Sequence, residues 1–233
     1  MTVRSAIFRL FKLTTLSAIL LFPALSVAQS EISREDLRDM SRNVIPETRS
    51  TETIGTPYLF DEFQNGVVTL KDGNITETLS MNFNVYENRV EYADGQAILA
   101  FLGDEITSFE IYDGPNLMSF KKGFEARGLE KDEFVQVLSE GSATGLLKHE
   151  ITFQQNVPTY GSATQRDEYV TNMRLYVHEN GETERIRRMS ERGITRSLNA
   201  DRNELRNFIS ENNLNLDNPY DLRQLFEFYN QIN

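Results

Sequence analysis

The middle of the chain, residues 57–188, consists of short runs in which apolar and polar residues alternate. The clearest run carries Leu79, Met81, Phe83 and Val85, separated by polar residues. Successive side chains of a strand point to opposite faces of its sheet, so these four share one face. Repeated runs of this kind, bounded by Gly, Asp and Asn, predict an antiparallel meander.

Asn180-Gly181 gives the most specific turn signal, because a tight two-residue hairpin needs positive φ at both positions. Glu87-Asn88 and Asp94-Gly95 predict two further turns. A return strand is expected at Val90 and Tyr92. Further strands are expected at Ala97 to Leu102, Ile106 to Tyr112, Leu117 to Phe120, Phe134 to Leu138, Leu147 to Phe153 and Tyr169 to Val177.

After Arg188 the apolar period changes from two residues to about 3.6, which indicates amphipathic helices. A weak helical pattern covers Ser190 to Leu198. Asp201 and Glu204 have the spacing of a capping box, and Asn218-Pro219 combines an N-cap with a proline suited to the first turn. The last helix is expected to pack on the sheet or on a partner through its candidate partner-binding residues, Leu222, Leu225, Phe226 and Tyr229.

These patterns predict an α+β fold that is mainly antiparallel β. The sheet is expected to be a meander that forms a curved sheet or a partly closed barrel or sandwich, followed by two or three short C-terminal helices. We expect residues 1–28 to be a signal peptide, 29–54 a polar tether with one short helix around Arg34 to Arg42, 55–188 the β domain, and 189–233 the helical segment.

The first 28 residues have the order of parts found in a secretory signal peptide. Arg4, Arg9 and Lys12 are basic, residues 13–25 are mainly apolar, and Ser26-Val27-Ala28 offers small residues for signal peptidase. The apolar stretch is shorter than the roughly 18 to 20 residues of a spanning helix. We therefore expect cleavage near Ala28, no transmembrane segment in the mature chain, and a location in the periplasm, at the outer membrane or outside the cell.

The chain is acidic and has no cysteine. Its formal net charge is −11, and removal of the three basic residues of the leader leaves 21 Lys and Arg against 35 Asp and Glu, a net charge of −14. This charge disfavours nucleic acid and anionic lipid surfaces as partners. The absence of cysteine excludes disulfides, thiol nucleophiles, iron–sulfur clusters, thiolate zinc sites and lipid attachment to a first mature cysteine.

Neither histidine, His149 nor His178, lies in a pattern with metal-site spacing. His149 falls on the apolar face of its strand, where we expect a hydrogen-bonded core or barrel-lining residue. His178 adjoins the Asn180-Gly181 turn and is expected to be a solvated turn residue. The sequence therefore gives no metal-binding residue.

Other short patterns also lack the context that chemistry needs. Residues 141–145 have the wrong spacing for a nucleophile elbow, and the GSAT tetrapeptide that begins at Gly141 and again at Gly161 is expected to form flexible loops. Ser119 and Lys122 match the SxxK pattern without its companion motifs. Acidic pairs carry little information among 35 acids. No catalytic and no cofactor-binding residue is identified.

Two parts of the chain resemble a group of uncharacterised exported proteins of Gram-negative bacteria. The first likeness is carried by Gly55-Thr56-Pro57-Tyr58-Leu59, Phe63, Gly66-Val67-Val68 and Asn82-Phe83-Asn84-Val85-Tyr86. The second is carried by Leu205, Phe208, Ile209, Leu222 and Phe226-Glu227-Phe228-Tyr229-Asn230. The resemblance spans most of the mature chain and implies a β-then-α plan and an envelope location, with no assigned activity.

A non-enzymatic envelope protein is the function that these features favour, as a binding or assembly module with an envelope protein as partner. The alternative is a carrier that encloses a lipid or other apolar ligand in a curved sheet, which an apolar cavity of several hundred cubic ångströms would indicate. A hydrolase with an unrecognised site is the third hypothesis. No cofactor is expected.

Overall fold

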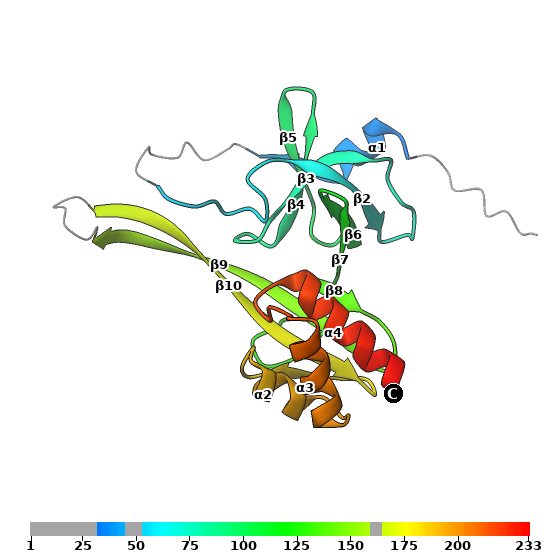
Figure 1. Cartoon of the computed structure of the whole chain (residues 1–233). Helices are drawn as coiled ribbons and strands as arrows, with labels where there is room; N and C mark the ends of the chain where they lie inside the picture. The colour runs from blue at the N-terminus through cyan, green and yellow to red at the C-terminus, as the bar shows by residue number, and fades with distance from the viewer. Residues whose placement is uncertain (1–31, 45–52, 159–164) are drawn as a thin grey trace, which may run out of the picture.

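An eleven-stranded antiparallel sheet and three C-terminal helices make up most of the molecule (Figure 1). The structure is a computed structural model and describes residues 32–44, 53–158 and 165–233. The strand order is β1-β5-β4-β3-β2-β6-β7-β8-β9-β10-β11, and the sheet does not close. The predicted fold class is confirmed.

A strand lies at every run where one was predicted between Leu79 and Val177, although the last two are longer than predicted. Individual strands at Ser41–Asn43 and Gln64–Leu70 were not predicted. The strands are β1 (Ser41–Asn43), β2 (Gln64–Leu70), β3 (Leu79–Asn84), β4 (Arg89–Asp94), β5 (Ala97–Phe101), β6 (Ile106–Asp113), β7 (Asn116–Lys121), β8 (Val135–Ser139), β9 (Thr144–Pro158), β10 (Gln165–Glu179) and β11 (Glu182–Ile186).

The helices are α1 (Arg34–Asp39), α2 (Glu191–Ser197), α3 (Arg202–Glu211) and α4 (Pro219–Ile232). Each begins after a capping side chain that accepts a hydrogen bond from the backbone of the first turn, at Ser33, Ser190, Asp201 and Asn218. Such a cap satisfies an N–H group that has no partner inside the helix. The predicted helix starts at Asp201 and Asn218 are confirmed.

Aromatic rings fill the inside of the curled part of the sheet formed by β2 to β7. The rings of Phe109 and Phe120 stack with centroids 4.6 Å apart, and Phe83 lies 5.2 Å from Phe109. Phe134 closes the group from the segment before β8, 5.0 Å from Phe109. All four side chains are buried, so their apolar area stabilises this half of the protein.

Residues 32–44 are attached to the sheet. α1 forms where a short helix was predicted, and Leu37 buries its side chain in the core. β1 then pairs with β5, from Ser41↔Phe101 to Asn43↔Leu99. This part of the predicted tether therefore belongs to the fold. One buried leucine and a three-residue strand attach it, which is too little for an apolar period to be visible in the sequence.

Residues 53–63 cover the outer face of β3 and β4. Asn82 on this face is buried, and its Nδ2 donates to the backbone of the covering segment at 2.8 Å. The buried carboxylate of Glu91 accepts from Tyr58 Oη at 2.8 Å and from Arg89 Nε at 2.6 Å. A buried charge with several hydrogen-bond partners avoids most of the cost of losing water.

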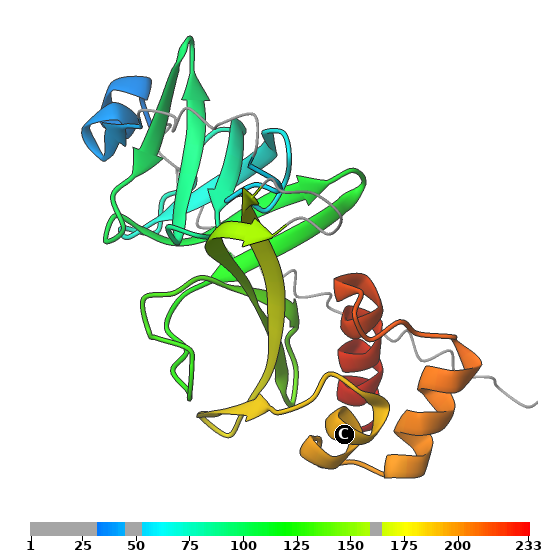
Figure 2. The same ribbon diagram turned by 90° about the vertical axis from the view of Figure 1, so that its left-hand side faces the viewer.

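Different parts of the chain cover the two faces of the sheet at β8 to β11, which form its lower half (Figure 2). The C-terminal helices lie on the face that carries Leu147 and Leu175. Residues 122–134 cover the opposite face, where Leu129 packs against Leu146 and Tyr176. Neighbouring residues of one strand thus belong to separate cores, as the alternation of side chains along a strand requires.

The predicted tight turn at Asn180-Gly181 is confirmed, with φ of 53° and 82°. We expect Gly181→Val to lower the free energy of unfolding by about 2 kcal/mol, because a side chain with a Cβ is strained at positive φ. Open space surrounds Gly181, so the backbone alone causes the effect. Thermal unfolding measures it, with Glu182→Val as control because the same side chain then sits at an exposed position of β11. Equal melting of both variants would contradict the strained turn.

Candidate functional site

The four candidate partner-binding residues lie in the core. Leu222, Leu225 and Phe226 are 0 % exposed and Tyr229 is 1 % exposed. They face β8 and β9, which α4 contacts directly. Of the two alternatives, packing on the sheet describes the structure. These side chains offer no surface to a partner while α4 stays docked.

The turn between β8 and β9 is docked against the C-terminal end of α4. Asn230 Oδ1 accepts from the Ala143 amide and from Ser142 Oγ, both at 3.0 Å. A Cβ at Gly141 would lie 2.4 Å from Asn230 Cγ, so only glycine fits there. The first GSAT copy is therefore a packed turn and not a flexible loop. The second copy lies outside the described residues.

His149 lies at the waist of the molecule, where the two halves of the sheet meet. Its Nε2 is 2.8 Å from Gln136 Oε1, and its ring lies 5.8 Å from that of Phe120. Burial lowers the pKa of His149 to about 4, so the imidazole is neutral at neutral pH. The expected hydrogen bond is present, and the side chain is half-buried at the margin of the core.

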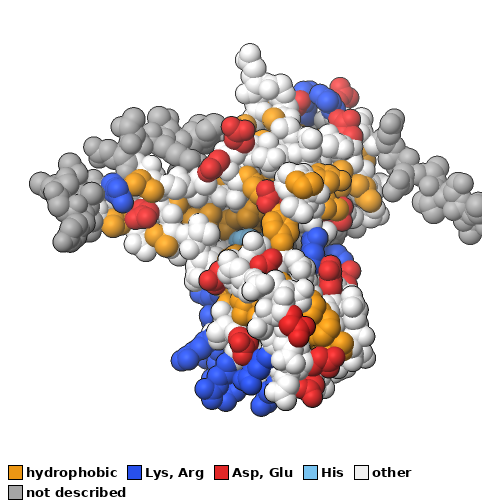
Figure 3. All heavy atoms as spheres, viewed as in Figure 1, with side chains coloured by type: hydrophobic (Ala, Val, Ile, Leu, Met, Phe, Trp, Pro, Cys, Tyr) orange, Lys and Arg blue, Asp and Glu red, His pale blue; other side chains and the backbone are white. Residues whose placement is uncertain are grey.

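A pocket of about 200 Å³ opens beside His149. Apolar side chains gather at this waist on the face shown in Figure 3, and four charged residues line the pocket. Lys148 Nζ lies 2.6 Å from a Glu133 oxygen, and Arg174 Nε lies 2.8 Å from a Glu150 oxygen. Because each charge has a partner, the pocket offers no unpaired group to a charged ligand.

His178 is half-buried in β10 and does not match the expectation of a solvated turn residue. Its Nδ1 lies 2.9 Å from Thr183 Oγ1 across the hairpin, and its ring lies 5.2 Å from that of Phe124. Residues 122–134, which lie far away in the sequence, cover the side chain of His178. The two histidines occupy separate places and form no common site.

Ser119 and Lys122 do not form a catalytic pair. Ser119 Oγ donates to Glu110 Oε1 at 3.2 Å. Lys122 Nζ donates to the Gly103 carbonyl and lies 4.2 Å from the centre of the Phe134 ring. Ser119 lies within β7, whereas Lys122 follows its end, and the two side chains bond to different partners. The SxxK pattern therefore brings no chemistry here.

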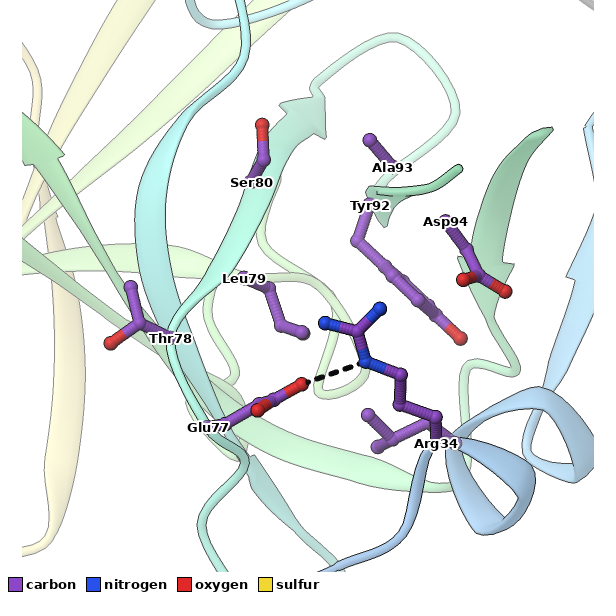
Figure 4. A pocket seen from close by; sticks show the side chains of 9 residues that line it. Arg34, Glu77, Thr78, Leu79, Ser80, Tyr92, Ala93 and Asp94 are labelled. Carbon is purple, nitrogen blue, oxygen red and sulfur yellow. Dashed lines mark hydrogen bonds and ion pairs between the residues drawn. The ribbon is translucent and has the colours of Figure 1, made fainter. Parts of the chain in front are cut away.

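A second small pocket, of about 180 Å³, lies beneath α1 (Figure 4). Its lining includes the apolar side chains of Leu37, Leu79 and Tyr92. The guanidinium of Arg34 reaches from α1 toward Glu77, with Nε 3.2 Å from Oε1. These two side chains are 73 % and 51 % exposed, and such exposed ion pairs contribute little. We interpret this pocket as imperfect packing beneath α1, from which Leu37 is the one side chain buried in the core.

Several arginines gather at the end of the sheet formed by β11. A hollow of about 720 Å³, which we call the arginine groove, is lined by Arg127, Thr183, Glu184, Arg185 and Arg187. Lys and Arg side chains are visible together at the lower end of the molecule in Figure 3. This local positive charge contrasts with the acidic composition of the chain.

The arginines of this region have no carboxylate partners among the described residues. Arg127, Arg185 and Arg187 of the groove are exposed, as are the three arginines that follow on the chain. None of the six forms an ion pair within the described part of the molecule. Guanidinium groups in this state can bind carboxylates or phosphates through pairs of N–H groups. The six are Arg127, Arg185, Arg187, Arg188, Arg192 and Arg196.

This region was missed in the sequence, although a signal is present. Five arginines occur within residues 185–196, and Glu191 is the single acid among them. A local count of charges identifies this stretch, whereas the net charge of the chain hides it. The groove also needs Arg127 from a distant segment, which no local count can supply.

Neither a metal centre nor a spanning helix is found in the described residues. Within residues 32–44, 53–158 and 165–233, no group of three or more His, Cys, Asp or Glu residues could hold a metal ion. No helix in the same ranges is long and apolar enough to cross a membrane. Comparison of the chain with known protein families, with curated proteins and with solved structures found no match.

Proposed function

We propose that the protein is a non-enzymatic binding or assembly module of the bacterial envelope, in the periplasm or at the outer membrane, and that its arginine groove holds an anionic partner. The observation that carries this proposal is the group of exposed, unpaired arginines on a strongly acidic chain. Like charges in one place repel each other unless an anion joins them. A bound anionic partner is the simplest reason to keep them together.

The carrier alternative has weaker support. Aromatic rings occupy the inside of the curled β2 to β7 region. The pockets at the waist and beneath α1 have volumes of about 200 and 180 Å³ and include charged residues. An apolar ligand of lipid size needs a larger and more apolar cavity than either.

Chromatography on immobilised poly-L-glutamate tests the proposal. At about 50 mM salt, where screening is weak, we expect the mature protein to be retained despite its negative net charge. Arg185→Glu/Arg187→Glu should pass through unretained. The control is Arg42→Glu/Lys71→Glu, which changes the net charge equally at two exposed residues away from the groove. Passage of the wild-type protein without retention would contradict the proposal.

A further inference from the structure

We infer that β11 accepts an acidic, extended segment of a partner protein as an additional strand, held by the free edge of β11 and by the arginine groove beside it. This inference rests on the proposed function, and it specifies the partner as a polypeptide and the binding mode as strand addition.

The outer edge of β11 is open in the described structure. β11 is the last strand in the sheet order and pairs only with β10. In a two-residue hairpin, the two residues that flank the turn bond to each other through both their N–H and C=O groups. Along the strands, such hydrogen-bonded pairs alternate with pairs whose backbone groups point away from the partner strand. The backbone hydrogen bonds to β10 are therefore made by Glu182, Glu184 and Ile186. The backbone N–H and C=O groups of Thr183 and Arg185 point away from β10. Neither of these two forms a backbone hydrogen bond with another described element.

The arginine groove lies against this edge. Thr183, Glu184 and Arg185 are consecutive, and consecutive side chains of a strand point to opposite faces. A hollow lined by all three must therefore run along the edge of the strand instead of over one face. An added strand would occupy the same space.

The charges on β11 predict the pattern of the added strand. Thr183 and Arg185 share the face of Tyr176 and His178, their pairing partners on β10. Glu182 and Glu184 lie on the other face. Opposite charges on neighbouring strands attract and like charges repel. The partner should therefore carry acids at alternate positions, on the arginine side, with uncharged residues between them.

A lipid surface is the weaker occupant. The large apolar side chains that are exposed lie outside the arginine groove, so none is placed to insert into a bilayer beside it. The net charge of −14 also repels an anionic membrane at long range. These side chains are Ile54, Ile75, Tyr86, Leu102 and Tyr112.

Fluorescence anisotropy with a labelled peptide of about eight residues, alternating Glu and Thr, tests the inference on the mature protein. Two further peptides carry N-methyl groups on all Glu or on all Thr residues. Alternate N–H groups of an added strand face the edge. We expect one methylated peptide to bind like the parent and the other to bind at least about tenfold more weakly. Arg185→Glu/Arg187→Glu should weaken the parent peptide about tenfold, and Arg42→Glu/Lys71→Glu should leave its binding unchanged.

Three results would overturn strand addition and leave the anionic partner in place. The first is equal binding of both methylated peptides. The second is no peptide binding by a protein that poly-L-glutamate retains. The third is groove-dependent flotation with phosphatidylglycerol vesicles in the absence of peptide binding, which would assign the groove to a lipid surface. Loss of retention on poly-L-glutamate would instead remove the proposed function itself.

Discussion

Leu225→Asp is expected to lower the free energy of unfolding by about 4 kcal/mol or more, a large fraction of the stability of a protein of this size. Leu225 is 0 % exposed between α4 and the sheet. The helix cannot readily turn the new charge toward water, because both of its ends are tied down. Arg223 Nη2 donates to the Leu117 carbonyl at 2.8 Å near the start, and Asn230 binds the β8–β9 turn near the end.

Urea and thermal unfolding of three variants measure this effect. Gln224→Asp is the matched control, since it places the same charge at the neighbouring, exposed position of α4. Its effect should stay within about 0.5 kcal/mol. Leu225→Ala keeps the test informative if the Asp variant does not fold, and should cost about 2 to 5 kcal/mol. Wild-type melting of both Leu225 variants would mean that α4 does not pack on the sheet in solution.

Elements whose signal lies within one segment could be predicted from the sequence. The alternation of apolar and polar residues identified β3, and the Asn180-Gly181 pair identified the turn between β10 and β11. Asp201 and Asn218 marked the starts of α3 and α4. In each case the residues that determine the conformation are neighbours on the chain, through strand alternation, positive φ or a helix cap.

Features that depend on a distant segment were not predictable. Asn82 lies on the polar side of β3 and is buried because residues 53–63 cross over it. His178 is half-buried because residues 122–134 cover its face. Gly141 is needed because Asn230 packs against it. Local patterns carry no record of which loop covers which face, because the covering residues lie far away in the sequence.

The arginine groove could be predicted from the sequence only in part. The excess of arginine in residues 185–196 is present in the sequence. Its meaning depends on β11 being the last strand of the sheet, and strand order follows from long-range pairing. Exposed charges also protect edge strands from unwanted pairing. β11 carries Glu182, Glu184 and Arg185. These charges disfavour pairing with most strands, and the added strand proposed above is the one whose charges complement them.

His149 is expected to make the protein less stable as the pH falls below about 6.5. Its pKa is about 4 in the folded protein, whereas an unfolded histidine has a pKa near 6.5. Above that value the imidazole is neutral in both states and the pH has no effect through this group. Between about 6.5 and 4 the unfolded chain binds the proton and the folded protein does not. Stability then falls by up to about 1.4 kcal/mol for each pH unit.

Urea unfolding at several pH values between about 7 and 4.5, within this window, measures the effect. His149→Gln keeps an amide that can bond to Gln136 and removes the titrating ring, so its stability should fall less steeply with pH than that of the wild type. His178→Gln, which removes the other histidine, is the control for loss of an imidazole elsewhere in the protein. Carboxylates titrate similarly in all three proteins, which makes the difference between slopes specific to His149. Parallel curves for the wild type and His149→Gln would show that the folded protein takes up a proton at the waist as readily as the unfolded chain does.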